Sequence, residues 1–136
     1  MELNLTPLEL ALASLKEVAE LDRAKQDLKM SAVVRDSAIQ RFEYTYELAW
    51  KTLQRYLQQD MGVDNVDHLS RKDLFRLAAE KALLNDPEQW FEYHQKRNRT
   101  SHTYDLNTAE SVYRSAVSFV HDAQQLLDVL QKRIDD

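Results

Sequence analysis

The chain has 136 residues, a formal net charge of −5, one glycine, two prolines and no cysteine. This length fits one domain spanning residues 1–136, with a substantial core. Scarce Gly and Pro, beside abundant Leu, Ala, Glu, Lys, Gln and Arg, predict an all-α fold of few, long helices. The absence of cysteine excludes disulfides, thiolate nucleophiles and thiolate metal sites. The acidic balance argues against a protein that coats nucleic acid through its overall charge.

The first predicted helix runs from Pro7 to about Leu28. Thr6 is a capping residue, Pro7 suits the first helical position, and Glu9 follows the cap by three residues. One apolar stripe follows, formed by Leu8, Leu12, Leu15 and Ala19. This start has no basic region and carries a glutamate inside its apolar run, so we expect neither a secretory signal nor a membrane span. A cytoplasmic protein without membrane contact is the resulting expectation.

The second predicted helix is the longest. Ser31 is its expected cap, and nothing interrupts the pattern from Ala32 until Gly62, which suits the left-handed residue that ends a helix. Glu47 and Lys51 are four residues apart in the favourable order for an ion pair. The apolar stripe comprises Phe42, Tyr46, Ala49, Trp50, Leu53 and Leu57, and we expect the aromatic residues of this helix to form core more than to stack on bases.

Residues 62–69 are predicted to form a loop because Asp and Asn alternate there with single valines. Ser70, with Asp73 three residues later, opens a short helix that ends near Leu84.

A fourth helix begins at Asp86-Pro87, and Asn107 is the expected cap of the last helix. The break between these two helices is predicted between about Thr100 and Asn107. Long stripes joined by short connections predict an antiparallel up-and-down bundle of four main helices plus one short helix. The stripe of the last helix comprises Val112, Ala116, Phe119, Val120, Ala123, Leu127, Leu130 and Ile134.

The run RNRTSHTYD, Arg97 to Asp105, carries more chemistry than helix packing requires. From His94 to Tyr104 the chain has three cations and no acidic residue, which suits a compact anion such as a phosphodiester or a nucleotide. The competing interpretation is a solvated helix face with a histidine that binds backbone carbonyls. Arg97 and His102 are five residues apart, about 140° around an ideal helix, so a shared site requires the helix to loosen near Thr100.

The spacing of Arg97, four residues, His102, one residue and Tyr104 resembles the signature of HEPN-domain proteins of the HepT type. These proteins are also described as substrate-binding partners of minimal nucleotidyltransferases. The segments RFEYTYELAWKTLQRYL, residues 41–57, and SHTYDLNTAE, residues 101–110, resemble the same family.

The resemblance implies a helical bundle that dimerises and places the motif in a cleft between protomers. It further implies a metal-independent endoribonuclease toxin with Arg97 and His102 as the catalytic pair. A cognate nucleotidyltransferase would silence it by adding adenylate to Tyr104. No cofactor is implied. Local charge and position, beyond the resemblance, assign Lys96, Asn98 and Arg99 to nucleotide or RNA binding.

Two further hypotheses remain open. The protein is alternatively a non-catalytic substrate-binding partner subunit of a minimal nucleotidyltransferase, or a bundle whose motif only ends a helix. A metal site is not expected, because His94 and His102 are eight residues apart and lack a ligand pair at three or four residues. His68 is predicted in a loop and His121 on a helix surface.

Overall fold

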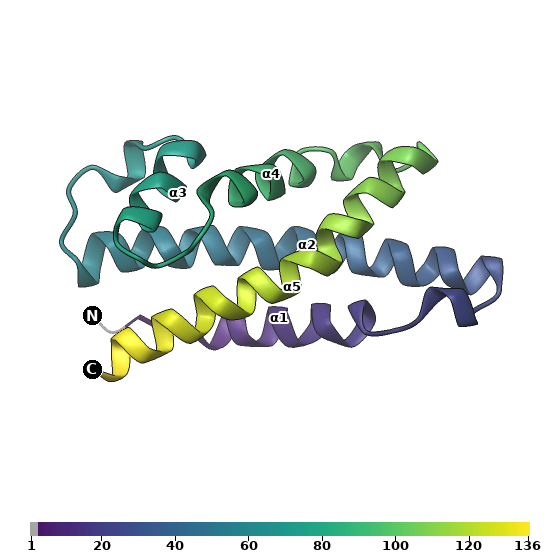
Figure 1. The fold of residues 1–136 in the computed structure, drawn as a ribbon, viewed down its shortest axis with the longest axis horizontal. Helices are drawn as coiled ribbons and strands as arrows, with labels where there is room; N and C mark the ends of the chain where they lie inside the picture. The colour runs from purple at the N-terminus through teal and green to yellow at the C-terminus, as the bar shows by residue number, and fades with distance from the viewer. Residues whose placement is uncertain (1–2) are drawn as a thin grey trace.

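The computed structural model describes residues 3–136, which fold into five α-helices and contain no strand. The helices are α1 (Thr6–Ala19), α2 (Leu28–Arg55), α3 (Arg71–Glu80), α4 (Pro87–Arg97) and α5 (Leu106–Asp135). Helices α1, α2, α4 and α5 alternate in direction, and the short α3 lies beside the C-terminal end of α2 (Figure 1). The predicted all-α bundle of four main helices and one short helix is confirmed. None of the helices in residues 3–136 combines the length and apolarity needed to cross a membrane.

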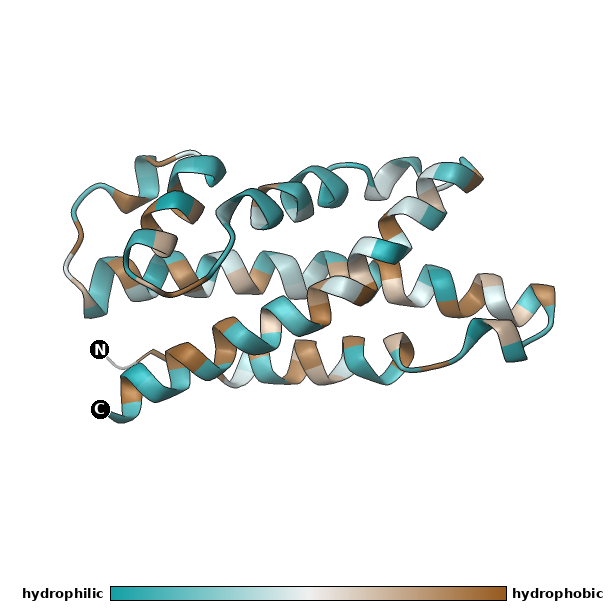
Figure 2. Ribbon diagram, viewed as in Figure 1, coloured by the Kyte–Doolittle hydropathy of each residue, from teal (hydrophilic) through white to brown (hydrophobic). Residues whose placement is uncertain are grey.

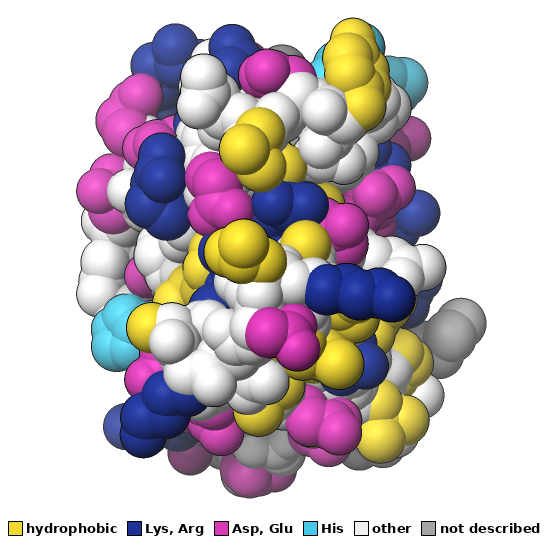
Figure 3. All heavy atoms as spheres, turned by 90° about the vertical axis from the view of Figure 1, so that its right-hand side faces the viewer, with side chains coloured by type: hydrophobic (Ala, Val, Ile, Leu, Met, Phe, Trp, Pro, Cys, Tyr) yellow, Lys and Arg dark blue, Asp and Glu magenta, His cyan; other side chains and the backbone are white. Residues whose placement is uncertain are grey.

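The two ends of the bundle differ. The start of α1 and the end of α5 lie at one end, whereas the junction between α4 and α5 lies at the other (Figure 1). Figure 3 looks onto this second end, where hydrophobic side chains stand exposed among charged ones. Large exposed hydrophobic residues of the elements at this end are Leu21, Leu28, Met30, Val33, Tyr104 and Leu106.

The first helix is shorter than predicted. α1 ends at Ala19, well before Leu28, because the chain then turns into a short 3-10 segment, Arg23–Lys25. The Asp22 carboxylate accepts a hydrogen bond from the Ala24 N–H at 3.0 Å and so competes with helix continuation.

The start of α1 lies one residue earlier than predicted, and the predicted cap was wrong. Thr6 is the first helical residue, while Leu5 occupies the cap position without a side-chain bond. The Asn4 side chain accepts a hydrogen bond from the Thr6 N–H at 3.1 Å instead. The Glu9 N–H, which a Thr6 cap would have bound, donates instead to the Leu5 carbonyl oxygen at 2.9 Å.

The start of α2 also differs from the prediction. Asp27 has extended backbone angles, and its carboxylate accepts a hydrogen bond from the Met30 N–H at 2.7 Å. The helix therefore begins at Leu28, and Ser31 lies within its first turn instead of capping it. The helix begins at this earlier position because the Asp27 carboxylate is a stronger hydrogen-bond acceptor than the Ser31 hydroxyl. Its negative charge also interacts favourably with the positive N-terminal end of the helix.

The far end of α2 follows the prediction in part. Regular helix stops at Arg55, and a π-helical turn, Tyr56–Asp60, continues it. Gly62 has φ of +64°, as expected for the residue that ends a helix. The predicted loop 62–69 is present and includes one short 3-10 turn, Val66–His68.

α3 has the predicted cap but ends early. The Ser70 hydroxyl accepts a hydrogen bond from the Asp73 N–H at 3.1 Å. The helix stops at Glu80 and not near Leu84, because Ala82 adopts a left-handed φ of +61°. A residue in that conformation cannot continue a right-handed helix.

The core centres on aromatic residues where α2, α4 and α5 meet. The ring centroid of Phe119 lies 4.9 Å from that of Tyr93, 5.3 Å from Phe42 and 5.4 Å from Trp90. All three pairs are close to edge-to-face, the arrangement that the ring quadrupoles favour. This cluster fixes α4 against α2 and α5 and thereby sets the position of the helix end that carries the motif.

Hydrophobic residues recur as bands along each helix (Figure 2). Most residues of the predicted stripes are buried, including Leu8, Leu12, Leu15, Phe42, Tyr46, Ala49, Leu53, Leu57, Val112, Ala116, Ala123 and Leu130. Trp50 is only partly buried and lies under the guanidinium of Arg71, while Tyr44 is exposed. His68 and His121 are exposed, in a loop turn and on α5, as predicted.

Candidate functional site

The motif occupies the junction between α4 and α5. α4 is capped by Asp86, as predicted, and ends at Arg97. A 3-10 turn, Thr100–His102, follows, and the Thr100 hydroxyl donates a hydrogen bond to the carbonyl oxygen of Arg97 at 2.9 Å. The predicted loosening of the helix near Thr100 is confirmed, and this side-chain bond to the backbone is a local cause.

α5 begins one residue after Asp105, and the predicted cap Asn107 was wrong. The Asp105 carboxylate accepts hydrogen bonds from the Thr108 N–H at 3.1 Å and from the Thr108 hydroxyl at 2.7 Å. These bonds stabilise the charged form and lower the pKa of Asp105. Asn107 therefore lies inside the first turn of α5, and the connection after His102 is only three residues long.

Arg97 is directed toward α2. Its Nε donates a hydrogen bond to Glu47 Oε1 at 2.8 Å, and its Nη2 lies 3.5 Å from Glu43 Oε1. The Arg97 and Glu47 side chains are 31% and 30% exposed, so solvent reaches this pair in part. Within residues 3–136 no hydrogen bond engages Arg97 Nη1. The guanidinium is thus anchored along one edge and keeps N–H donors for another ligand.

His102 and Tyr104 form a second part of the motif. Their ring centroids lie 6.1 Å apart, with the planes inclined at 73°. His102 is exposed, and Tyr104 is 86% exposed. In the described part of the chain, no hydrogen bond or ion pair joins Arg97 to His102. Within one protomer, the His102 imidazole therefore lies beside the Tyr104 ring, whereas the Arg97 guanidinium contacts the carboxylates of Glu47 and Glu43.

Asn98 connects the motif to the core through a histidine. Its Nδ2 lies 3.5 Å from His94 Nε2, and His94 Nδ1 lies 2.9 Å from the Tyr46 hydroxyl. Burial lowers the pKa of His94, with a smaller contribution from the charge of Arg71. Burial also raises the pKa of Tyr46. Both groups are therefore neutral at pH 7. Asn98, His94 and Tyr46 form a row of neutral polar groups that leads from the surface into the core.

Lys96, near the end of α4, and Arg99, in the turn that follows it, form a further part of the site. Lys96 Nζ donates a hydrogen bond to the Ser111 hydroxyl on α5 at 2.8 Å. Lys96, Asn98 and Arg99 line a cavity of about 350 Å³ together with Gln95. The sequence predicted Lys96, Arg97 and Arg99 as one basic group. The structure separates Arg97, which contacts α2, from Lys96, which contacts α5. Among residues 3–136, no three His, Asp or Glu side chains gather as a metal site would require.

An ion-pair cluster braces the same end of the bundle. Arg23 makes two hydrogen bonds of 2.8 Å to the carboxylate of Glu110, in the first turns of α5. Arg35 of α2 lies 3.4 Å from the same carboxylate. The hydrogen bond from Arg23 is the largest cause that lowers the pKa of Glu110, to about 2. The start of α5, and with it the motif, is therefore tied to α2 and to the segment that precedes it.

The partners of Arg97 were not found from the sequence. Glu47 was noted only as a partner of Lys51, and that ion pair is present at 3.9 Å. A signal did exist, because Glu43 and Glu47 are four residues apart and repel each other on one helix face. Two such carboxylates indicate a cation from another element. The Ser111 contact had no comparable signal.

The sequence of residues 3–132 matches the family described as nucleotidyltransferase substrate binding protein like. A curated relative from Haemophilus influenzae (strain ATCC 51907 / DSM 11121 / KW20 / Rd), named probable ribonuclease HepT, is 38% identical over 139 residues. That alignment covers 97% of this chain and 94% of the relative.

Two solved structures share the fold. A Haemophilus influenzae protein, described as revealing the fold of a substrate binding domain of a nucleotidyltransferase, matches with a TM-score of 0.85 and 34% identity. The match covers 94% of this chain and 99% of that one. A Thermus thermophilus protein matches with a TM-score of 0.76 and 36% identity, over 95% and 99% of the two chains. The chain therefore belongs to the HEPN-like family of nucleotidyltransferase substrate-binding proteins.

Proposed function

We propose that the protein is a HepT-type toxin of a nucleotidyltransferase-linked toxin–antitoxin pair. In this proposal it is a metal-independent endoribonuclease with Arg97 and His102 in a groove between two protomers, silenced by adenylylation of Tyr104. The observation that carries the proposal is the exposed His102–Tyr104 pair on the connection that directly follows Arg97. The curated relative named probable ribonuclease HepT supports it.

The chemistry of RNA cleavage explains the choice of residues. The ribose 2′-oxygen bonds to phosphorus while the bond from phosphorus to the 5′-oxygen breaks. A base takes the proton of the 2′-hydroxyl, an acid protonates the leaving 5′-oxygen, and a cation offsets charge on the phosphoryl oxygens. An exposed imidazole suits the proton transfers, and the free edge of Arg97 suits the phosphoryl oxygens.

We infer two protomers because one imidazole cannot easily take the proton of the 2′-hydroxyl and protonate the 5′-oxygen in the same step. A two-fold dimer brings two copies of His102 and Arg97 to one groove. The exposed hydrophobic side chains at the motif end of the bundle, such as Leu28 and Leu106, offer a surface for that contact (Figure 3). The dimer also brings a second imidazole to Arg97, which within residues 3–136 of one protomer makes no hydrogen bond to His102.

Tyr104 suits a control point. At 86% exposure its hydroxyl is open to a modifying enzyme, and its ring lies 6.1 Å from the imidazole of His102. An adenylate on this hydroxyl adds bulk and a negative phosphodiester beside the proposed catalytic group. Both effects oppose the binding of an RNA phosphate.

A non-catalytic partner of a minimal nucleotidyltransferase is the second candidate. The ion pairs of Arg97 with Glu47 and Glu43 favour it, because a guanidinium held by two carboxylates has less charge to offer a phosphate. The description of the Haemophilus influenzae structure as a substrate binding domain of a nucleotidyltransferase points the same way.

Cleavage assays separate the two candidates. We expect the wild-type protein to cleave single-stranded RNA in the presence of a chelator, and His102→Ala to lose this activity. His121→Ala is the matched control, because His121 is also exposed but lies on the surface of α5. Equal cleavage by wild type and His102→Ala at equal purity contradicts the ribonuclease proposal and favours the partner role.

Mixing protomers tests the shared groove. When wild-type and His102→Ala chains are denatured and refolded together, only dimers with two wild-type chains keep both imidazoles. Activity should therefore fall with the square of the wild-type fraction. A linear fall, or a monomeric mass under assay conditions, contradicts the two-protomer mechanism.

Coexpression with a cognate nucleotidyltransferase tests the control point. Mass spectrometry should find the adenylate on the peptide with Tyr104, and the Tyr104→Phe variant should remain toxic in the presence of the partner. Tyr44→Phe is the control, since Tyr44 is an exposed tyrosine on α2. Silencing of the toxin with an unmodified Tyr104 would count against this part of the proposal.

A further inference from the structure

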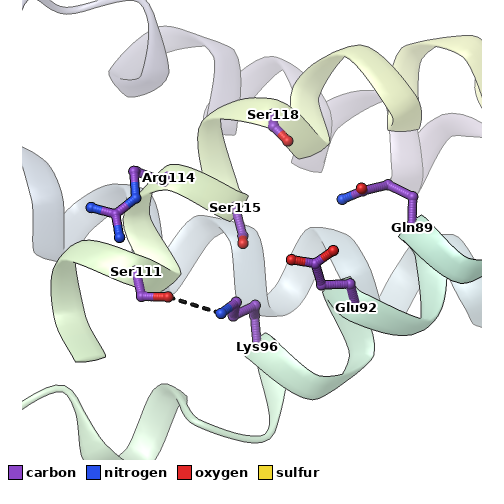
Figure 4. A pocket seen from close by; sticks show the side chains of 7 residues that line it. All are labelled: Gln89, Glu92, Lys96, Ser111, Arg114, Ser115 and Ser118. Atoms are coloured by element: carbon purple, nitrogen blue, oxygen red, sulfur yellow. Dashed lines mark hydrogen bonds between the residues drawn. The ribbon is translucent and has the colours of Figure 1, made fainter. Parts of the chain in front are cut away.

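Two polar cavities on the α4–α5 side of the bundle meet at Lys96. The first, of about 350 Å³, includes Arg99 in its lining. The second, of about 390 Å³, lies between the two helices (Figure 4). Its lining residues are Gln89, Glu92, Lys96, Ser111, Arg114, Ser115 and Ser118. A continuous polar face therefore runs from the motif along α5.

This face carries cations that the protein does not neutralise. Within the described residues Arg99 and Arg114 form no ion pair, and Lys96 donates to the Ser111 hydroxyl and not to Glu92, four residues earlier. Five other arginines of the described residues, including Arg23 and Arg97, are held by carboxylates. Unneutralised cations lining adjoining cavities provide local attraction for an extended anion.

The remaining lining suits phosphate and ribose. Ser111 lies beside Lys96 and Arg114, the Ser115 hydroxyl and the Glu92 carboxylate face each other near the middle of the cavity, and Gln89 lies toward its other end (Figure 4). Hydroxyl, ammonium and guanidinium donors bind phosphoryl oxygens. The carboxylate of Glu92 repels a phosphate, and its oxygens suit hydrogen bonds from ribose hydroxyls.

We propose that this α4–α5 face binds the sugar–phosphate backbone of a single-stranded RNA, with phosphates at Arg99, Lys96 and Arg114. The proposal rests on the proposed RNA substrate and extends its contact surface to Ser111, Ser115 and Arg114. These residues guide the strand and take no part in the proton transfers. Such contacts are independent of base identity and sensitive to salt.

Binding of a fluorescent RNA oligonucleotide to the His102→Ala protein, followed by anisotropy at several salt concentrations, tests the proposal. Arg114→Gln in that background should weaken binding roughly fivefold at low salt, the upper range for one exposed charge contact. The slope of log affinity against log salt should become shallower by about 0.7, the value for one phosphate contact to a single strand. Glu92→Gln should tighten binding, because it removes the repelling carboxylate.

Arg55→Gln is the matched control. Arg55 is exposed near the end of α2 and, among residues 3–136, also lacks an ion pair, so its loss removes the same charge away from this face. The proposal is overturned if Arg114→Gln and Arg55→Gln have equal effects, or if Glu92→Gln fails to tighten binding. It is also overturned if adenosine monophosphate competes as well as the oligonucleotide, which would indicate a mononucleotide site.

The experiment distinguishes failure of this strand-binding proposal from failure of the ribonuclease proposal. If His102→Ala cleaves as well as wild type while Arg114→Gln still lowers the salt slope, strand binding stands and catalysis by His102 fails. If His102→Ala abolishes cleavage while Arg114→Gln binds RNA like the Arg55→Gln control, catalysis by His102 is supported. The proposal that RNA binds the α4–α5 face is then wrong.

Discussion

Removing the carboxylate of Glu47 tests whether Arg97 acts from a fixed position. Glu47 holds Arg97 Nε at 2.8 Å and also accepts a hydrogen bond from Trp50 Nε1 at 3.1 Å, so it connects the guanidinium to the rest of α2. We treat Glu47 as a positioning residue. Glu47→Ala should lower kcat because the guanidinium loses its anchor, and should lower KM because a negative charge leaves the proposed groove.

The size of the effect follows from the geometry. A hydrogen bond to a charged group contributes about 1.5–3 kcal/mol where it is sheltered. Both side chains are about 30% exposed, so screening reduces the contribution to about 1 kcal/mol. If that anchoring is realised in the transition state, kcat should fall roughly fivefold. Glu47→Gln keeps an oxygen acceptor for Nε, so it should restore part of kcat while it retains the lower KM.

Steady-state cleavage of a quenched fluorescent oligonucleotide gives kcat and KM separately. Glu43→Ala is the control, because this substitution also removes one negative charge near Arg97. The Glu43 carboxylate lies 3.5 Å from Arg97 Nη2 and makes no hydrogen bond to it. Glu43→Ala should lower KM with little change in kcat. An unchanged kcat in Glu47→Ala, or an equal loss in Glu43→Ala, refutes the positioning role.

Three further predictions concern the stability of the fold. Phe119→Ala, at the centre of the aromatic cluster, should lower the free energy of unfolding by about 3–5 kcal/mol in chemical denaturation. The partly exposed Val117→Ala on the same helix should change it by less than about 0.5 kcal/mol, and a small loss in Phe119→Ala would contradict the core assignment. The pKa of Glu110 is lowered to about 2 by its arginine partners, so its contribution to stability is complete above the unfolded value of 4.5 and is lost as pH falls toward 2. The difference in stability between wild type and Glu110→Gln should therefore shrink between pH 5 and 2, and a constant difference would refute this linkage. Gly62→Ala should cost about 1 kcal/mol because φ is +64°, whereas Ala82→Gly should stabilise by about 0.5 kcal/mol because φ is +61°, and the same sign for both would be inconsistent with the backbone argument.

Helices were predictable here because their signals are local. Apolar stripes and capping residues lie within one or two turns of each other, so all five helices were found in their correct order. Their ends were harder to place. Asp27 and Ser31 both suit the start of α2, and Asp105 and Asn107 both suit the start of α5. Such alternatives differ by a few tenths of a kcal/mol, which packing elsewhere decides.

The candidate site was predictable only where it is continuous in sequence. His102 and Tyr104 lie on one short connection, so their proximity follows from spacing. Lys96 and Arg97 are neighbours in sequence but point about 100° apart on a helix, so they contact different elements. The rotation of α4 about its axis, set by the aromatic core, decides that Arg97 meets Glu47. No pattern within α4 contains that information.

The distance between the two ends of the bundle bears on how a partner enzyme can be joined to it. α5 has 30 residues and is therefore about 45 Å long, and it separates Tyr104 from the far end of the bundle. A flexible linker of n residues has a root-mean-square end-to-end distance of about 5–6 Å multiplied by √n, so roughly 60–80 residues give a typical distance equal to that length. An affinity tag on the end of α5 leaves the motif end open, whereas an enzyme tethered there by a linker of fewer than about 13 residues, too short even when extended, reaches Tyr104 only on another molecule.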